Sequence, residues 1–414
     1  MKKILVYSVL ILFVLICIKQ PTHAQDRAYA KKIIADLCTE DMAGRGYVDN
    51  GVNKAADYIA KEFRKLKLDK FKGSYFQDFS FPINTFPYPI RCALDNKVLT
   101  VGKDFLMSPE SGPCNGTYNL LHYDLEDSLE SVLYDRKTQI GLQKNEVLIV
   151  RNKSDNFEPM ENSIVVKNLN RKLIHSLAPK AKGGCQLIFH DSTISNAGNL
   201  YIKSENKEVA LFESKNVVAY LPAKKKRNRN KYIVFTAHYD HLGKMGDAIF
   251  PGASDNASGT AMVLNLAKHY AKLDNEYSMV FILFAGEEAG LIGSDFFTTF
   301  PTFNIQKIKM LINLDIMGSA ENGIVVVNAT EFPRQFASLQ KINKQEGYLP
   351  EVRKRGPTKN SDHYHFYKKG IPSFFIYSNG GPGYYHDVMD TPESIPMSNY
   401  ENVFKLLTDF VNTF

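Results

Sequence analysis

Residues 232–241 read YIVFTAHYDH, an apolar run of six residues followed at once by polar and aromatic ones. A short, near-continuous apolar run is typical of a strand that is buried on both faces of a sheet. Further runs of the same kind cover residues 216–220, 279–285, 308–314, 324–327 and 373–377. Segments with a helical period, such as residues 259–273, lie between several of them. The pattern predicts an α/β fold with a mixed, mostly parallel central sheet between helices.

Acidic and histidine residues follow these runs where the expected strands end. Ligands bind at the carboxyl ends of strands in such sheets, so side chains that follow different strands can meet at one edge. Alone, each residue is explained as well by a turn or a helix cap, and only their coincidence points to a site. The residues concerned are His238, Asp240, Asp255, Glu287, Glu288, Asp315 and His386.

The donor types in this group predict a metal centre. Carboxylates and imidazoles without thiolates suit zinc, or less often cobalt or manganese. The three carboxylates of Asp255, Glu288 and Asp315 carry −3, too much for one divalent ion, whereas two ions leave +1 for a bridging hydroxide to neutralise. Two ions per chain are therefore expected. Side chains two apart in an extended chain face the same way, so the carboxylate of Asp240 can hold His238.

The motifs resemble those of the M28 family of zinc aminopeptidases. They occur in family order as His-x-Asp (238–240), Gly-x-x-Asp-Asn-x-x-Gly (252–259), Gly-Glu-Glu (286–288), Asn-Leu-Asp (313–315) and Tyr-His (385–386), with further similarity at 40–45 and 216–220. The resemblance implies that His238 and Asp315 bind one zinc ion, Glu288 and His386 bind the other, and Asp255 bridges them. Glu287 would be the general base for a metal-bridging water, and Asp240 would orient His238. The implied activity is hydrolysis of N-terminal residues from peptides.

Two positions depart from the family pattern. His365 stands where similar members often have proline, and Tyr384 stands where an acidic residue is expected before the Tyr-His pair. Neither change removes a metal ligand, so both bear on the shape of the substrate pocket. The reaction also needs a donor to the developing oxyanion, for which the candidates are His363, Tyr364 and Tyr385.

The rest of the chain divides into two domains. Residues 91–212 contain short, strand-like runs, could form a helix over 171–182, and lack clustered metal-binding side chains. We expect a catalytic domain formed by residues 25–90 and 213–414. Residues 91–212 would be a small β-rich inserted domain, similar to the protease-associated domains of some relatives.

The N-terminus has the pattern of a secretory signal. Lys2 and Lys3 precede the apolar run 4–18, and small residues at 22 and 24 suit a cleavage site. We expect a signal peptide at residues 1–24, cleavage after Ala24, a secreted or periplasmic protein, and no stable membrane insertion afterwards. The formal net charge of +7 falls to +4 when the three lysines of this segment are removed, too little to indicate nucleic-acid binding.

Cysteine pairing and oligomeric state stay open. The cysteines that remain after processing allow three pairings; they are Cys38, Cys92, Cys114 and Cys185. The expected partner is a peptide substrate.

Three other functions are weighed against the aminopeptidase. A carboxypeptidase on the same scaffold would use the same ligands. A glutaminyl cyclase would need one zinc ion, and relatives of that type typically lack the first histidine and a full second metal set, which His238 and Asp315 supply here. A non-catalytic binding protein would be expected to lack Glu287 or part of the ligand set.

Overall fold

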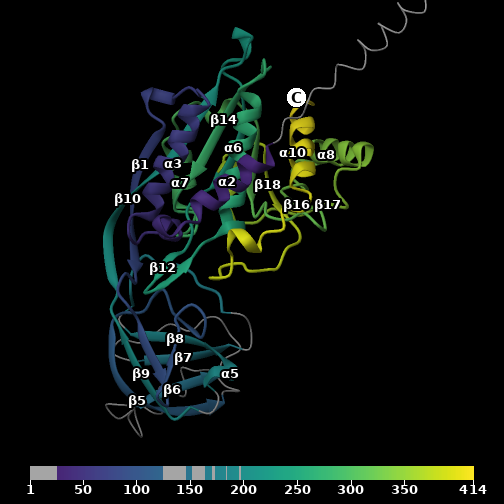
Figure 1. Cartoon of the computed structure of the whole chain (residues 1–414). Helices are drawn as coiled ribbons and strands as arrows, with labels where there is room; N and C mark the ends of the chain where they lie inside the picture. Colours follow the sequence, from purple (N-terminus) through teal and green to yellow (C-terminus); the bar gives the residue numbers. More distant parts are fainter. Residues whose placement is uncertain (1–25, 125–145, 152–163, 170–172, 183, 195–196) are drawn as a thin grey trace, which may run out of the picture.

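The computed structural model contains two eight-stranded sheets, in the upper and lower parts of Figure 1. It describes residues 26–124, 146–151, 164–169, 173–182, 184–194 and 197–414. The long strands β1 (Phe76–Thr85) and β10 (Lys207–Leu221) lead from one sheet to the other and back. The expected signal peptide lies outside the described residues. Within the described ranges, no helix combines the length and apolar character needed to cross a bilayer.

The elements of the upper part alternate between strands and helices. Its other strands are β11 (Tyr232–His238), β14 (Ser278–Phe284), β15 (Ile308–Asp315), β16 (Ile324–Val327), β17 (Val352–Lys354) and β18 (Ser373–Ser378). Its helices are α2 (Arg27–Leu37), α3 (Gly51–Lys65), α6 (Gly259–Tyr270), α7 (Ile292–Thr299), α8 (Pro333–Glu346), α9 (His363–Lys368) and α10 (Tyr400–Val411). Short helical turns cover Glu40–Arg45, Phe71–Gly73, Lys226–Asn228, Ala253–Ser258, Ile305–Lys307 and Pro392–Ser394. A two-stranded ribbon pairs β12 (Gly243–Met245) with β13 (Ala248–Phe250).

The upper sheet has the strand order β1-β10-β14-β11-β15-β18-β16-β17. Its central strands β14, β11, β15 and β18 are parallel to one another. The antiparallel strands β10 and β16 flank them. The predicted mixed, mostly parallel sheet is confirmed. Because the four central strands point the same way, their carboxyl ends lie along one edge.

Alternate side chains of these strands enter two different cores. Along β11, Ile233 and Phe235 pack with residues of α2, α3 and α6, whereas Val234 packs with Phe297 of α7 and Phe366 of α9. All five side chains are fully buried, and each contributes about 1.5–3 kcal/mol of hydrophobic free energy. Because helices cover both faces of the sheet, apolar and polar residues do not alternate along β11.

The lower sheet is formed by the segment between β1 and β10. Its strand order is β3-β2-β9-β5-β6-β7-β8-β4. The strands are β2 (Arg91–Leu94), β3 (Lys97–Leu99), β4 (Phe105–Met107), β5 (Cys114–Asp124), β6 (Glu146–Arg151), β7 (Ile164–Leu169), β8 (Cys185–His190) and β9 (Asn199–Ser204), and a short helix α5 covers Asp191–Ile194. A disulfide joins Cys114 to Cys185, and Cys38 and Cys92 are free.

Two details of this segment differ from the sequence expectation. The expected boundary at residue 212 falls inside β10, which pairs continuously with β1 and β14, while β9 ends at Ser204. The helix expected over 171–182 is absent from its described part, 173–182, where Ala178 forms an isolated bridge with Asn84 of β1. Pairing with a distant strand outweighs local helix propensity there.

Candidate metal centre and active site

The ends of the central strands bring the expected residues together. His238 and Asp315 are the last residues of β11 and β15, and Glu287 follows β14 closely. Asp255 lies in the helical turn that leads into α6, and His386 lies in the loop after β18. Since β14 and β15 are the two neighbours of β11, three of these side chains come from adjacent strands.

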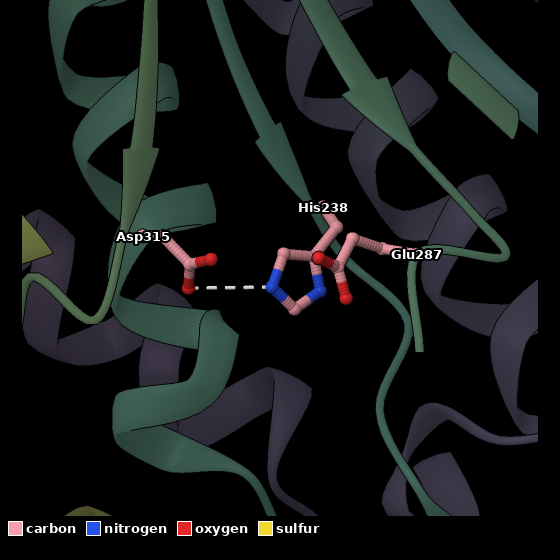
Figure 2. A group of neighbouring side chains, drawn as sticks. All are labelled: His238, Glu287 and Asp315. Atoms are coloured by element: carbon pink, nitrogen blue, oxygen red, sulfur yellow. Dashed lines mark hydrogen bonds and ion pairs between the residues drawn. The ribbon is translucent and has the colours of Figure 1, made fainter. Parts of the chain in front are cut away.

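One half of the cluster is built around His238. Figure 2 shows the side chains of His238, Glu287 and Asp315, which offer atoms within 4.8 Å of one another. The Nε2 atom of His238 lies 3.3 Å from Oδ1 of Asp315 and 3.4 Å from Oδ1 of Asp255. A second group with the same spacing joins His238, Asp255 and Glu288.

The other half is built around His386. Its Nε2 atom lies 3.2 Å from Oδ2 of Asp255 and 3.1 Å from Oε2 of Glu288. Asp255 therefore directs one carboxylate oxygen toward His238 and the other toward His386. This is the geometry expected of a carboxylate that bridges two cations.

The donor set fits divalent cations. Nε2 of His386 is buried and faces carboxylate oxygens of Asp255 and Glu288, so the neutral imidazole can bind a cation together with them. Four carboxylates gather with two imidazoles, and such crowding of negative charge is unfavourable unless cations or protons offset it. Carboxylate and imidazole ligands without thiolate suit zinc.

The pKa values of these groups reflect the same crowding. Burial and the neighbouring Glu288 raise the pKa of Glu287 well above its usual value. For Glu288 the cost of burial is outweighed by His386, which helps to lower the pKa to about 2. For His386 the opposing effect of burial is outweighed by Glu288 and Asp255, which raise the pKa to about 11. Without bound metal, the imidazole proton takes the place of the missing positive charge.

Asp240 connects the end of β11 to the loop that carries the two glutamates. Its carboxylate accepts hydrogen bonds from the main-chain N–H groups of Glu287 and Glu288, both at 3.3 Å, and from the Tyr47 hydroxyl at 2.7 Å. Nδ1 of His238 lies closer to the main-chain oxygen of Asp240, at 3.2 Å, than to its carboxylate, at 3.8 Å. The Asp240 carboxylate thus faces His238 and also forms hydrogen bonds with the Glu287 loop and with Tyr47.

Several residues around the cluster were not singled out from the sequence. The Nδ1–H of His241 donates a hydrogen bond to Oε1 of Glu288 at 2.7 Å. Asp390 accepts hydrogen bonds from the main-chain N–H groups of Ser254 and Asp255 at 2.9 and 3.0 Å. His241 stands next to the quoted His-x-Asp motif, but nothing in the sequence indicates that it reaches Glu288.

Arg45 anchors the loop that carries Asp255. Its guanidinium is fully buried and donates to the carbonyls of Pro251 and Gly252, both at 2.6 Å, and of Tyr239 at 2.8 Å. These carbonyls flank Asp255 and the end of β11, so one side chain ties both ligand-bearing segments together. The sequence signal was the Gly44-Arg45 stretch, which gave only a weak family resemblance.

The three oxyanion candidates lie in different surroundings. Tyr385 adjoins His386, and its ring stacks on that imidazole with centroids 3.8 Å apart. His363 is fully buried, with its ring 5.2 Å from that of Phe375. Tyr364 is partly exposed and lies under the ammonium group of Lys359, 5.7 Å from its ring centroid. The stacking places Tyr385 beside the cluster.

A pocket opens beside Asp255 and Tyr385. Its walls are formed by Ser254, Asp255, Ile316, Gly318, Ser319, Gly380, Gly381, Pro382, Gly383, Tyr384, Tyr385, Asp390, Ser394, Ile395 and Pro396. Its charged members are Asp255, in the cluster, and Asp390, which is engaged by main-chain N–H groups. The remaining wall is apolar or neutral.

Known proteins are similar to this chain in sequence. An aminopeptidase of Bacillus subtilis, YwaD, is 25% identical over 375 residues, which are 86% of this chain and 78% of that protein. A glutaminyl-peptide cyclotransferase of Boiga irregularis is 26% identical over 230 residues, 44% of this chain and 61% of its own length.

The fold matches that of solved peptidases. The structure of BSAP, a zinc aminopeptidase from Bacillus subtilis, superposes with a TM-score of 0.68 at 19% identity, covering 94% of this chain and 95% of that one. Residues 216–411 match the model of peptidase family M28. This stretch contains every expected metal-binding residue, Asp240 and Glu287. The match assigns residues 216–411 to peptidase family M28.

Proposed function

We propose that this protein is a two-zinc aminopeptidase that removes N-terminal residues from peptides. The observation that carries the proposal is the position of Asp255, whose two carboxylate oxygens lie 3.4 Å from His238 Nε2 and 3.2 Å from His386 Nε2. His238 and Asp315 would hold one ion, and Glu288 and His386 the other. The expected signal peptide would place this activity in the periplasm or outside the cell.

When bound, the two ions would lower the pKa of water and polarise the scissile carbonyl. Glu287 serves as general base, because its carboxylate adjoins both His238 and Asp315 and is not needed as a ligand. Its raised pKa suits a group that takes a proton from the attacking water and passes it to the leaving amine. Tyr385, stacked on His386, is the preferred donor to the oxyanion.

The proposed substrates have an apolar first residue. Among the described residues, those that line the pocket next to Asp255 and Tyr385 include no lysine or arginine to pair with an acidic side chain. Beyond the cluster, its one carboxylate, Asp390, already accepts two main-chain hydrogen bonds, so a basic side chain finds no open partner. Ile316 and Ile395 suit an aliphatic or aromatic group instead.

The base is tested with Glu287→Gln. The variant keeps the size of the side chain and removes its basicity, so we expect two zinc ions per chain and a loss of kcat of at least about 100-fold. Glu346→Gln makes the same change on the exposed face of α8 and should leave kcat unaltered. Full activity of Glu287→Gln would exclude Glu287 as the base.

The direction of cleavage is tested with one peptide in three forms. We expect hydrolysis of the peptide with a free N-terminus and of its C-terminal amide, and none of its N-acetylated form. Cleavage of the acetylated form, with none of the C-terminal amide, would indicate a carboxypeptidase. Release of a pyroglutamyl product from a glutaminyl peptide, without hydrolysis, would indicate a cyclase, and zinc binding without turnover a non-catalytic protein.

A further inference from the structure

Residues 173–178, which lie between β7 and β8 in the chain, contact the loop that carries His386. Residues 173–178, which we name the strap, have an extended pattern in which alternate side chains turn inward: Leu173, His175 and Leu177 are less exposed than Ile174 and Ser176. Leu177 packs against the cores of both sheets. The strap is therefore held between the two parts of the molecule.

The strap meets the loop after β18 at His386. The main-chain oxygen of His175 lies 2.9 Å from Nδ1 of His386, and the His175 N–H donates to the His386 carbonyl at 3.4 Å. Two hydrogen bonds thus join residues that are 211 positions apart in the chain.

His175 is itself firmly placed. It is 3% exposed, and its ring packs against Phe250 with centroids 4.8 Å apart. Three residues further on, the carbonyl of Ala178 accepts a hydrogen bond from the Asn84 N–H of β1 at 2.8 Å. The segment that carries the His175 carbonyl is therefore fixed in position by ring packing and by main-chain hydrogen bonding.

His386 needs such a support more than His238 does. His238 ends a strand, and its Nδ1 contacts the carbonyl of Asp240 only two residues away. His386 lies in a loop, and its backbone φ of +55° is in the left-handed region that residues other than glycine rarely adopt. A ligand in this conformation is held in place only when its surroundings determine it.

We propose that the strap is a positioning element of the metal centre and that the carbonyl of His175 orients His386. The inference rests on the proposed two-metal function. A histidine that binds a metal usually donates its other ring N–H to an acceptor, which sets its tautomer and direction. Here the acceptor is His175 O: with the proton on Nδ1, Nε2 points to Asp255 and Glu288. The segment expected to be a separate insert thereby completes one of the two metal sites.

The test uses the full chain with His175→Gly, compared with Ile174→Gly. Both variants add the same backbone freedom to the strap, but only the first removes a buried ring, since Ile174 is 41% exposed. We expect His175→Gly to bind one of the two zinc ions about 10–100-fold more weakly and the other as the wild type does, by calorimetry. Ile174→Gly should bind both with nearly wild-type affinity. Equal affinities in the wild type and both variants would overturn the proposal.

A spectroscopic measurement keeps the proposal testable if His175→Gly does not fold. In ¹⁵N-histidine NMR spectra of the metal-loaded wild type, Nδ1 of His386 should carry a slowly exchanging proton. In the milder His175→Ala variant, this proton should exchange faster. An unprotonated Nδ1 in the wild type would overturn the proposal. A wild type that binds two ions but cleaves no peptide would instead refute the proposed function and leave the strap intact.

Discussion

The hydroxyl of Tyr47 donates a hydrogen bond to Oδ2 of Asp240 across 2.7 Å, and both side chains are buried. Tyr47 comes from the loop before α3, whereas Asp240 follows β11. This contact links the N-terminal helices to the loop of Glu287, because the Asp240 carboxylate also accepts the Glu287 N–H.

Tyr47→Phe should therefore reduce catalysis more than stability. Loss of the hydrogen bond frees the Asp240 carboxylate to shift, and we expect kcat/KM to fall about 10-fold. The free energy of unfolding should fall by about 1–2 kcal/mol. Tyr348→Phe removes a similar bond, to Asp409, away from the cluster, and should leave kcat/KM intact. Equal kinetic effects of the two variants would contradict this role.

Arg45→Met should weaken both the fold and zinc binding. The change removes the guanidinium donor from the carbonyls of Pro251 and Gly252, which keep only the weaker Cys38 thiol and the Ala257 N–H as partners, and each lost hydrogen bond from the charged group costs about 1–3 kcal/mol. Urea unfolding and zinc titration would measure both losses. Arg353→Met removes an exposed arginine that pairs with Glu351, and should change stability by less than about 0.5 kcal/mol. A variant that loses stability but binds zinc normally would limit Arg45 to a structural role.

His241→Phe should lower the affinity of the metal site. The 2.7 Å contact from Nδ1 holds Glu288, a proposed ligand, so we expect zinc affinity to fall about 10–100-fold. His365→Phe removes a histidine that pairs with the more exposed Asp295 at 3.1 Å and serves as the control. Unchanged zinc affinity in His241→Phe would show that Glu288 is positioned by other contacts.

Stability should depend on pH in opposite directions with and without zinc. In metal-free protein the pKa of His386 is raised from 6.5 to about 11, so its stabilising contribution is complete below pH 6.5 and is lost as the pH rises toward 11. The pKa of His238 is raised as well, against the effect of burial, by Asp315 and Glu287. Zinc must displace these protons, so its affinity rises with pH. Urea unfolding at pH 6 and pH 9 should show the metal-free protein losing stability and the zinc-loaded protein gaining it. The same slope in both forms would contradict protonated imidazoles in the metal-free site.

Ile395→Asp should change the preferred substrate. A carboxylate in the neutral wall of the pocket disfavours an apolar side chain and gives a basic one a partner. We expect kcat/KM for an N-terminal leucine to fall at least about 10-fold and that for lysine to rise. Phe300→Asp adds the same charge at a residue that is 61% exposed and should alter neither value. An unchanged leucine-to-lysine ratio would place the substrate side chain elsewhere.

The fold and the central cluster could be predicted because their signals are local. A strand covered on both faces must be apolar throughout, so residues 232–238 mark such a strand without reference to the rest of the chain. Parallel strands end at one edge, which is why His238 and Asp315 could be expected to meet. The two come within 3.3 Å.

The supporting contacts could not be predicted, because each joins distant parts of the chain. Nothing near Tyr47 indicates that it meets Asp240, 193 residues later. The expected helix over 171–182 was wrong in its described part for the same reason, since pairing with Asn84 and His386 holds that segment extended.

The sequence by itself determined the sheet, the residues at its edge and the chemistry that they can offer, because burial and strand direction follow from the order of residue types. Only the tertiary structure decided how those residues are held. Arg45, Tyr47, His241 and the strap act through hydrogen bonds whose partners become neighbours when the chain folds, and such contacts leave no periodic trace in the sequence.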